Sequence, residues 1–356
     1  MPIYGHCTFE TATLSFPHPM NTTELDFQYP EELIATERSP ITRVMFVEKN
    51  QPREISIEAL LGKFESGDVL VINNTQVLKR RVFTQEKLEI LFLSENNDGS
   101  WQVLCPASKW KQNTKQNLSG GIHLELIARG RPQTVKPSES LTENFFAQYG
   151  ELPLPPYIQK ARANRHNTNQ DTTSYQTKWA EKPGSLAAPT ASLHFTQANL
   201  EQLESQGVKI AHMTLHVGLG TFLPITGDTL DAHEMHFEWS EIPKQTWATI
   251  QQAKLAKHKI WAIGTTVTRA LESIPKEILK PNLHGDFVGE TNLFIRPGFE
   301  YKVVDRLLTN FHQPKSTLLA LVAAFSDLQT VKSCYRWAIE KKFRLFSYGD
   351  LTVWIK

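Results

Sequence analysis

Helix and strand signals alternate at both ends of this chain, and a run of short strands without convincing helices interrupts them. Before that run we expect helices over residues 31–37 and 56–66 and strands over 43–48 and 68–73. Within it, residues 88–93, 101–105 and 122–127 form short strands separated by turn sequences such as NNDGS and SGG. Closely spaced short strands of this kind are typical of a small β-barrel or sandwich.

Alternation resumes after residue 150. A helix over 141–149 leads into GELPLPPY (150–157), whose prolines predict a stiff extended connector or a plain spacer. The polar, basic residues 159–171 are expected to be mobile. Helices are predicted over 197–206, 244–257, 317–325 and 331–343, and strands over 208–217, 259–263, 292–296, 303–309 and 351–355.

The simplest arrangement is a mixed α/β main domain, formed by residues 21–76 and 150–356, with a small β-barrel domain over 77–149 inserted into it. Residues 1–20 are predicted to be an irregular N-terminal extension. A chain of 356 residues is long enough for two such units.

Composition excludes several classes of protein. Lysine plus arginine (38) nearly balances aspartate plus glutamate (37), so any nucleic-acid footprint must be local. Three distant cysteines predict neither a disulfide framework nor a zinc site. No signal peptide and no membrane-spanning apolar run is seen, which predicts a soluble, cytoplasmic protein.

The segment GSLAAPTASLHF (184–195) fits no regular element. Proline breaks its middle, small residues dominate it, and its few polar groups, among them Ser185, Thr190 and His194, are spaced for contacts. A connection so poor in charge is unlike a solvated loop. It is either a tightly packed connection or, as we favour, a buried wall that faces a ligand.

Three predicted strands are followed by loops that could carry chemistry: GLGTF (218–222), GTT (264–266) and NFHQPKST (310–317). If the strands are parallel, all three loops emerge at the carboxyl edge of the sheet, where open α/β folds bind ligands. The GTT loop combines close backbone approach with a helix start that suits a carboxylate or phosphate. Ordinary capping of a helix by threonine is the alternative.

The spacing of His233 and His236 could bind a metal on a helix, but no third ligand is identifiable and the His-Glu-x-x-His order is absent, so no metal site is predicted. P-loop, GxGxxG and nucleophile-elbow motifs are also missing. Basic and aromatic residues interleave near 79–83, 157–166 and 337–344, where they could meet an RNA backbone or form solvated faces.

An ordered series of longer motifs resembles the S-adenosylmethionine:tRNA ribosyltransferase-isomerase family of queuosine biosynthesis. The similarity is strongest over residues 150–350 and thinner before them. It comprises GELPLPPYI (150–158), YQT (175–177), residues 184–195, TLHVGLGTF (214–222), HEMH with Glu238, GTT with Arg269 and LES (271–273), FIRPGF (294–299), TNFHQPKSTLL (309–319), FSYGD (346–350) and NNT (73–75).

The resemblance implies an α/β domain interrupted by a small β-barrel, in agreement with the pattern above. It also implies that S-adenosylmethionine serves as a ribosyl-donor substrate, with no bound cofactor. The ribosyl unit would pass to 7-aminomethyl-7-deazaguanine at the tRNA wobble position and rearrange to epoxyqueuosine, while adenine and methionine leave. The partners expected are this tRNA and S-adenosylmethionine, without a membrane, and the protein is expected to be a monomer.

Candidate site residues follow from the motifs and from the demands of this chemistry. The sulfonium acidifies the ribose C5′ hydrogens, so one general base suffices to form an ylide. His194, His216 and Asp350 are candidate catalytic residues. Residues expected to bind substrate are Ser185, Thr190, Thr265, Thr266, Arg269, Asn310, His312, Lys315, Ser316, Thr317 and Tyr348. Residues expected to bind tRNA are Lys79, Arg80, Arg81, Lys160, Arg162 and Arg165.

The chain departs from the family pattern at residues 36–43, at Gln76 and at Thr268. These departures affect the tRNA-facing side more than the donor pocket. They leave open a second hypothesis, a divergent RNA-binding paralogue with an altered acceptor or without catalysis. A metal hydrolase built on His233 and His236 is a third.

Overall fold

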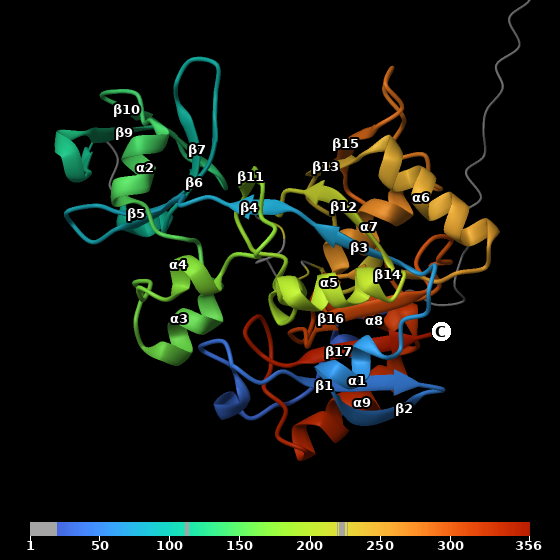
Figure 1. Cartoon of the computed structure of the whole chain (residues 1–356). Coiled ribbons are helices and arrows are strands. Elements are labelled where there is room, and N and C mark those ends of the chain that lie inside the picture. Colours follow the sequence, from blue (N-terminus) through green and yellow to red (C-terminus); the bar gives the residue numbers. More distant parts are fainter. Residues whose placement is uncertain (1–19, 111–113, 219, 221–224, 226) are drawn as a thin grey trace, which may run out of the picture.

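The computed structural model describes residues 20–110, 114–218, 220, 225 and 227–356 (Figure 1). A nine-stranded sheet forms the centre of its larger part, in the order β15-β13-β12-β3-β14-β16-β17-β1-β2. The strands are β1 (Arg43–Glu48), β2 (Gln51–Ser56), β3 (Val69–Asn73), β12 (Lys209–Leu215), β13 (Glu238–Ile242), β14 (Ile260–Ile263), β15 (Phe287–Thr291), β16 (Arg306–Asn310) and β17 (Leu351–Ile355).

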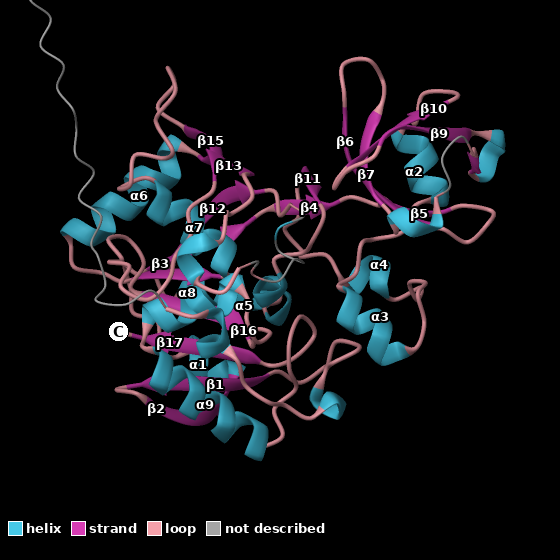
Figure 2. Ribbon diagram, turned by 180° about the vertical axis from the view of Figure 1, so that it is seen from behind, coloured by secondary structure: helices cyan, strands magenta, loops and turns pink. Residues whose placement is uncertain are grey.

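Neighbouring strands β12, β3, β14 and β16 are parallel, so their carboxyl ends meet at one edge of the sheet. Both faces of this sheet are covered (Figure 2). Along β3, Val69 and Val71 pack into one apolar core while Leu70 and Ile72 pack into the other. This double burial explains why the strand has a continuous apolar sequence.

One core receives side chains from α6 (Lys244–Leu255), α7 (Thr265–Ser273), α8 (Thr317–Phe325) and α9 (Leu328–Glu340), and the other from α1 (Ile57–Leu61) and α5 (Gln197–Ser205). Local capping explains where several of these helices begin. Thr196 caps α5, Ser316 caps α8 and Asp327 caps α9, each accepting a hydrogen bond from a backbone N–H in the first turn. The mixed α/β prediction is confirmed.

A second sheet projects from one side of the larger part (Figures 1 and 2). Its order is β5-β6-β7-β10-β9-β8, and it packs on α2 (Glu143–Tyr149) around a separate core between Val82 and Phe146. Its strands are β5 (Arg81–Phe83), β6 (Glu89–Glu95), β7 (Trp101–Leu104), β8 (Gln116–Asn117), β9 (His123–Ala128) and β10 (Gln133–Pro137).

The sheet is curled so that its two edge strands, β5 and β8, approach each other. Gln85 N–H, just after β5, donates to Asn117 O of β8 at 2.8 Å. Among the described residues, β5 and β8 do not pair as strands. The expected closed barrel is therefore observed only as a curled sheet. The domain boundaries at 77 and 149 stay a prediction, and of the expected extension 1–20 only Met20 is described.

Several predicted elements need correction. Residues 31–37 form only a 3₁₀ turn, Glu31–Leu33, and the strand expected over 292–296 lies earlier, as β15. Of the segment 159–171 that is expected to be mobile, residues 159–162 belong to α3 (Pro156–Arg162) and residue 171 begins α4 (Asp171–Ser174). Pro156 at the start of α3 is a helix-initiating signal that the polar composition obscured. A two-stranded sheet joins β4 (Thr75–Val77) to β11 (Lys182–Ser185).

Candidate active site

A cavity lies at the carboxyl edge of the large sheet, where the sequence predicts a ligand. We call it the donor cavity. It is lined by Pro155, Pro156, Tyr157, Tyr175, Ala187, Ala188, Pro189, Thr190, Ala191, Val217, Gly264, Thr265, Thr266, Thr309, Asn310, Phe311, His312, Gln313, Ser316, Leu318, Phe346 and Ser347. Loops after β14 and β16 therefore meet there, together with the segment 187–191. Leu219, Thr221 and Phe222 of the predicted loop GLGTF (218–222) lie outside the described residues.

Most of the segment 184–195 is buried, and its centre forms one side of the donor cavity. Its small residues permit close approach: a Cβ at Gly184 would lie 2.6 Å from the ring of His216. Ser185 Oγ donates to Ala187 O at 2.7 Å and accepts from Val217 N–H at 2.9 Å. The hydroxyl of Ser185 thus attaches the wall to the end of β12 rather than facing the cavity.

Helix α7 begins directly at the donor cavity. Its N-cap is Gly264, which adopts φ 97° and provides no capping side chain. Thr265 and Thr266 line the cavity, and Thr266 Oγ1 accepts from Asn73 Nδ2 at 3.5 Å. Since the first backbone N–H groups of a helix have no partner within the helix, this end can hold an anion. By contrast, the first turn of α8 is capped by Ser316.

A chain of hydrogen bonds connects the wall to the loop after β16. Thr190 Oγ1 donates to Asn310 Oδ1 at 2.8 Å, and Asn310 Nδ2 donates to His194 Nε2 at 3.1 Å. With Nε2 accepting, Nδ1 carries the proton and donates to Thr42 Oγ1 at 3.2 Å. Burial, reinforced by Arg38 and Arg344, lowers the pKa of His194 to about 3. The imidazole is therefore neutral, and both of its nitrogens are occupied.

His312 lines the donor cavity and is also neutral, because burial lowers its pKa to about 3. Its Nε2 lies 2.8 Å from Thr309 Oγ1, and its backbone N–H donates to Tyr335 OH at 3.0 Å. Across the cavity, Ser347 N–H donates to Tyr157 OH at 3.2 Å. Burial raises the pKa of Tyr157 to about 12, so its hydroxyl stays protonated.

Of the residues predicted to be catalytic, none lines the donor cavity. His216 stacks on Trp239 with ring centroids 4.9 Å apart, and its Nδ1 contacts Thr75 Oγ1 at 2.8 Å. Burial lowers the pKa of His216. Asp350 Oδ2 accepts from Arg344 N–H at 2.8 Å, and burial raises the pKa of this carboxyl.

Several residues predicted to bind substrate have partners within the protein. Arg269 is buried and pairs with the buried carboxylate of Glu238, so the carboxylate it holds is the protein's own. Lys315 Nζ pairs with Asp26 Oδ2 at 2.7 Å. Tyr348 OH donates to Asp171 Oδ1 at 3.0 Å, and Thr317 lies at the start of α8 without lining the cavity. Thr190, Thr265, Thr266, Asn310, His312 and Ser316 do line it.

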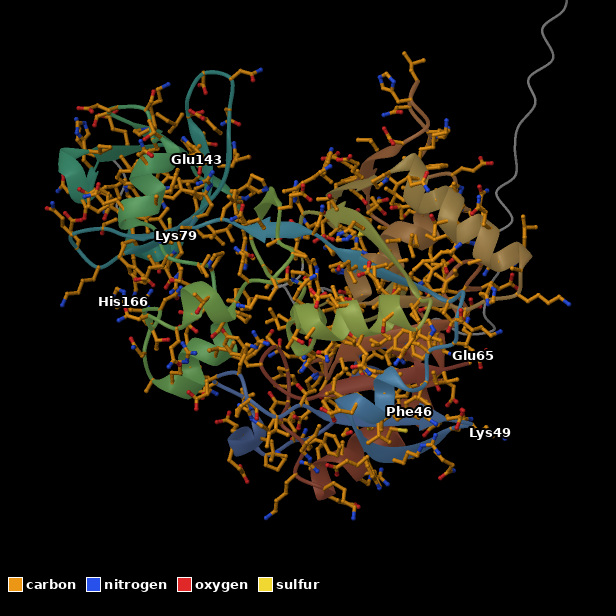
Figure 3. The ribbon with its side chains drawn as sticks, viewed as in Figure 1. Phe46, Lys49, Glu65, Lys79, Glu143 and His166 are labelled. Carbon is orange, nitrogen blue, oxygen red and sulfur yellow. The ribbon has the colours of Figure 1, made fainter. Side chains whose placement is uncertain are left out.

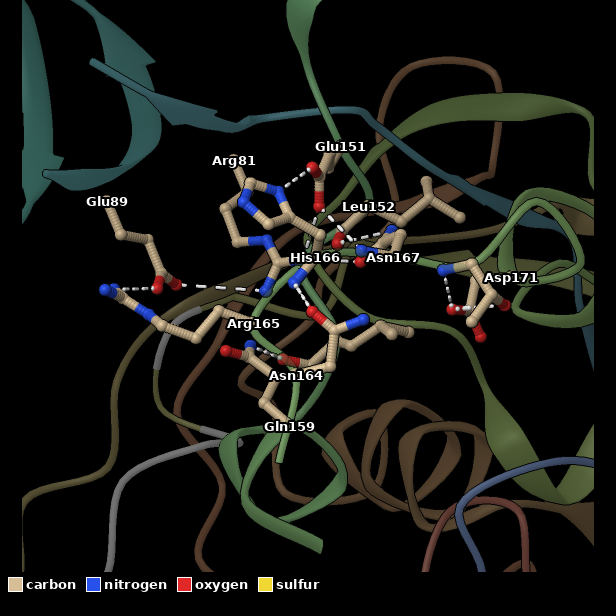
Figure 4. Close-up of polar contacts among 12 residues, drawn as sticks. Arg81, Glu89, Glu151, Leu152, Gln159, Asn164, Arg165, His166, Asn167 and Asp171 are labelled. Carbon is tan, nitrogen blue, oxygen red and sulfur yellow. Dashed lines mark hydrogen bonds and ion pairs between the residues drawn. The ribbon is translucent and has the colours of Figure 1, made fainter. Parts of the chain in front are cut away.

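The cations predicted to bind tRNA fall into two groups. Arg80, Arg81 and Arg162 are engaged by Glu143, Glu151 and Asp171 respectively, so their guanidinium groups are not open to phosphate. Figure 4 shows Arg81 of β5 held by Glu151 and Asn167, which docks the second sheet on the loop after α3. Lys79, Lys160 and Arg165 are more exposed, although Lys160 pairs with Glu31 and Arg165 with Glu89.

The sequence analysis did not predict four residues that line the donor cavity: Tyr157, Tyr175, Phe346 and Ser347. Each belongs to a recognised motif, GELPLPPYI, YQT or FSYGD, but nothing local indicates which side chains face inward. Among the described residues no three His, Cys, Asp or Glu side chains come together as a metal site. No helix of the described residues is long and apolar enough to cross a membrane.

Two comparisons place this geometry among known proteins. The family described as queuosine biosynthesis protein matches residues 22–354. The solved structure of an S-adenosylmethionine tRNA ribosyltransferase from Thermotoga maritima is similar at 29% identity and a TM-score of 0.53, covering 93% of this chain and 99% of that one. The match extends over nearly the whole chain, including the loops around the donor cavity, and the chain belongs to the queuosine biosynthesis family.

Proposed function

We propose that this protein transfers and isomerises the ribosyl unit of S-adenosylmethionine onto 7-aminomethyl-7-deazaguanine at the wobble position of tRNA. The products would be epoxyqueuosine-tRNA, adenine and methionine. The family and the similar ribosyltransferase make the chain a transferase enzyme. The specific donor, acceptor and product are proposed mainly from the donor cavity, where the charge-poor segment 187–191 faces the uncapped N-terminus of α7.

Each side of the cavity suits a different part of the donor. The backbone N–H groups at the start of α7, with the hydroxyls of Thr265 and Thr266, would bind the methionine carboxylate. The wall 187–191 would pack against the nucleoside, positioned by the hydrogen-bonded Asn310 amide. The cavity holds about 100 Å³, below the roughly 300 Å³ at the lower end of small-molecule sites. Donor binding is therefore expected to move the walls apart.

His312 is the best-placed general base among the described residues, because it is the imidazole that lines the cavity. Burial keeps this imidazole neutral at physiological pH, but a pKa of about 3 makes it a weak base, so its position in the cavity carries the assignment. In the first step it would take a proton from C5′ of the ribose, leaving the electron pair beside the sulfonium. We assign His194 and His216 as positioning residues, since their contacts fix Asn310 and the wall.

The test is incubation of the purified protein with S-adenosylmethionine and tRNA that carries 7-aminomethyl-7-deazaguanine. Adenine should appear only when both substrates are present, and mass spectrometry of the digested tRNA should show the epoxycyclopentane nucleoside. Binding of both substrates without adenine release would instead support the RNA-binding paralogue that the departures at 36–43 and Gln76 suggest.

The assignment of His312 has its own test. A His312→Gln variant should retain donor binding by calorimetry but lose adenine release, whereas His194→Gln should weaken donor binding as well. If His312→Gln releases adenine at the wild-type rate, the base lies elsewhere.

A further inference from the structure

Two further cavities lie in sequence beside the donor cavity, and each shares lining residues with its neighbour. Ser347 lines both the donor cavity and a narrow cavity beside His194. Arg38 and Tyr348 line both this narrow cavity and a third one, of about 630 Å³, which we call the polar cavity. The polar cavity is lined by Thr36, Glu37, Arg38, Arg162, Asn164, Thr168, Asn169, Gln170, Asp171, Ser174 and Tyr348.

Arg38 stands at the junction of these cavities and differs from the arginines around it. Arg162, on the same cavity, forms a bidentate pair with Asp171 at 2.6 and 2.9 Å. Arg38 has no carboxylate partner among the described residues, and its Nη2 donates only to the backbone carbonyl of Leu193. A half-buried guanidinium normally has an anionic partner, because desolvating an unpaired cation is costly. The missing partner points to an anion from outside.

The charges near Arg38 also favour the binding of an external anion. Arg344 lies close by and donates to the backbone carbonyl of Glu37. It forms no salt bridge in the described part of the chain, although its charge acts on the carboxyl of Asp350. The positive charges of Arg38 and Arg344 both contribute to lowering the pKa of His194, so both act on the end of the segment 184–195. The buried carboxylate of Asp171 is neutralised by Arg162, and Glu37 is exposed. Asp350 also lines the narrow cavity, but the charges acting on its buried carboxyl are those of Arg43 and Arg344. Arg38 is therefore the cation at this junction that has no carboxylate of its own among the described residues.

The polar cavity has the chemistry of a nucleobase site. Asn169 and Gln170 are exposed, and no hydrogen bond of their side-chain amides is found within the described residues. Amides offer both donors and acceptors, as the edge of an unpaired base requires. Beneath them the floor is rigid, because Asp171 accepts from Thr168, Arg162 and Tyr348 together.

We propose that Arg38 binds a backbone phosphate of the acceptor RNA, and that the polar cavity takes an unstacked nucleotide next to the one whose base enters the donor cavity. This inference rests on the proposed function, since it supposes an RNA acceptor. A chain of linked cavities with a cation between them fits successive nucleotides of one strand.

The test measures binding of an unmodified tRNA transcript to the full-length protein over a range of KCl concentrations. Arg38→Gln should weaken binding about tenfold and reduce the slope of log K against log salt by about 0.7 to 0.9, the contribution of one phosphate contact. Arg38→Lys should keep the slope. Asn169→Ala and Gln170→Ala should weaken binding without changing the slope.

Arg53→Gln is the matched control. Arg53 lies on β2, opposite Phe46 of β1, and pairs with Glu48 at the surface. Figure 3 shows Phe46 and Lys49 at the end of the molecule away from Lys79, Glu143 and His166. This variant should bind tRNA with the wild-type affinity and slope. An equal loss in Arg53→Gln, or an unchanged slope in Arg38→Gln, would overturn the proposal.

Calorimetry with S-adenosylmethionine separates this inference from the proposed function. Arg38→Gln should bind the donor as the wild type does, and an equal loss of donor affinity would place Arg38 in the donor site and refute the RNA contact. If the wild type releases no adenine but Arg38→Gln shows the reduced salt slope of tRNA binding, the proposed function is refuted and the contact of Arg38 with RNA is supported. If the wild type is active and Arg38→Gln binds tRNA normally, only the RNA contact fails.

Discussion

Replacing Glu238 by glutamine tests whether Arg269 is a structural residue or a donor ligand. Both residues are 4% exposed, and their ion pair joins α7 to β13. Glu238 Oε1 also accepts from Gly218 N–H at 2.9 Å, and Arg269 Nε donates to Leu293 O at 3.1 Å. The pair therefore fixes the helix whose first turn faces the donor cavity.

The expected magnitude follows from burial. Removing one partner of a buried ion pair leaves the other charge desolvated, at a cost of about 3–5 kcal/mol. Arg269 Nη2 already has no hydrogen-bond partner among the described residues, so the guanidinium has little to replace the carboxylate. Against a total stability of about 5–15 kcal/mol, such a loss is large. Adding Arg269→Met to Glu238→Gln should restore part of the loss, because no buried charge then remains.

Urea unfolding followed by tryptophan fluorescence measures these differences, with midpoints compared at an unchanged m-value. Donor affinity by calorimetry is the second measurement. A loss below about 1 kcal/mol in Glu238→Gln would contradict the structural role. So would an Arg269→Met variant of wild-type stability with weakened donor binding, which would return Arg269 to the substrate site that the motif suggested.

Three further predictions concern the wall and its neighbours. Gly184→Ala should lower the thermal midpoint, because the new Cβ would meet the ring of His216 at 2.6 Å, and an unchanged midpoint would show that the ring moves freely. Asn310→Ala should raise KM for the donor more than it lowers kcat, as steady-state adenine release will show. The pKa values of His194 and His312 are lowered to about 3, so the unfolded chain binds more protons below pH 6.5 and stability falls from pH 6.5 toward 3. Each histidine should account for about 2 kcal/mol of that loss at pH 5, and a His194→Asn variant with an equally steep acid limb in urea titrations would contradict this.

The sequence alone determined most types of element and predicted that the loops 264–266 and 310–317 meet at one edge of the sheet, as they do at the donor cavity. Periodicity placed β1, α8 and β17 at their observed bounds, because buried apolar runs and caps are local signals. It missed β2 and β13, whose polar sequences QPREIS and EWSEI lack a strong apolar pattern. The sequence pattern also did not predict that, among the described residues, β5 and β8 remain unpaired with each other, so that the barrel is not closed. Closure of a barrel depends on the curvature of the whole sheet, which no single strand sequence specifies.

Only the tertiary structure decided what each polar side chain does. The sequence shows an arginine, but Arg81 finds Glu151 seventy residues away and Arg269 finds Glu238 thirty-one residues away, whereas Arg38 finds no carboxylate in the described chain. A charge in a folded protein is defined by its partners and its burial, and both are long-range properties. The motifs therefore identified the loops that line the donor cavity, and the packing of the sheet edge selected which of their residues face it.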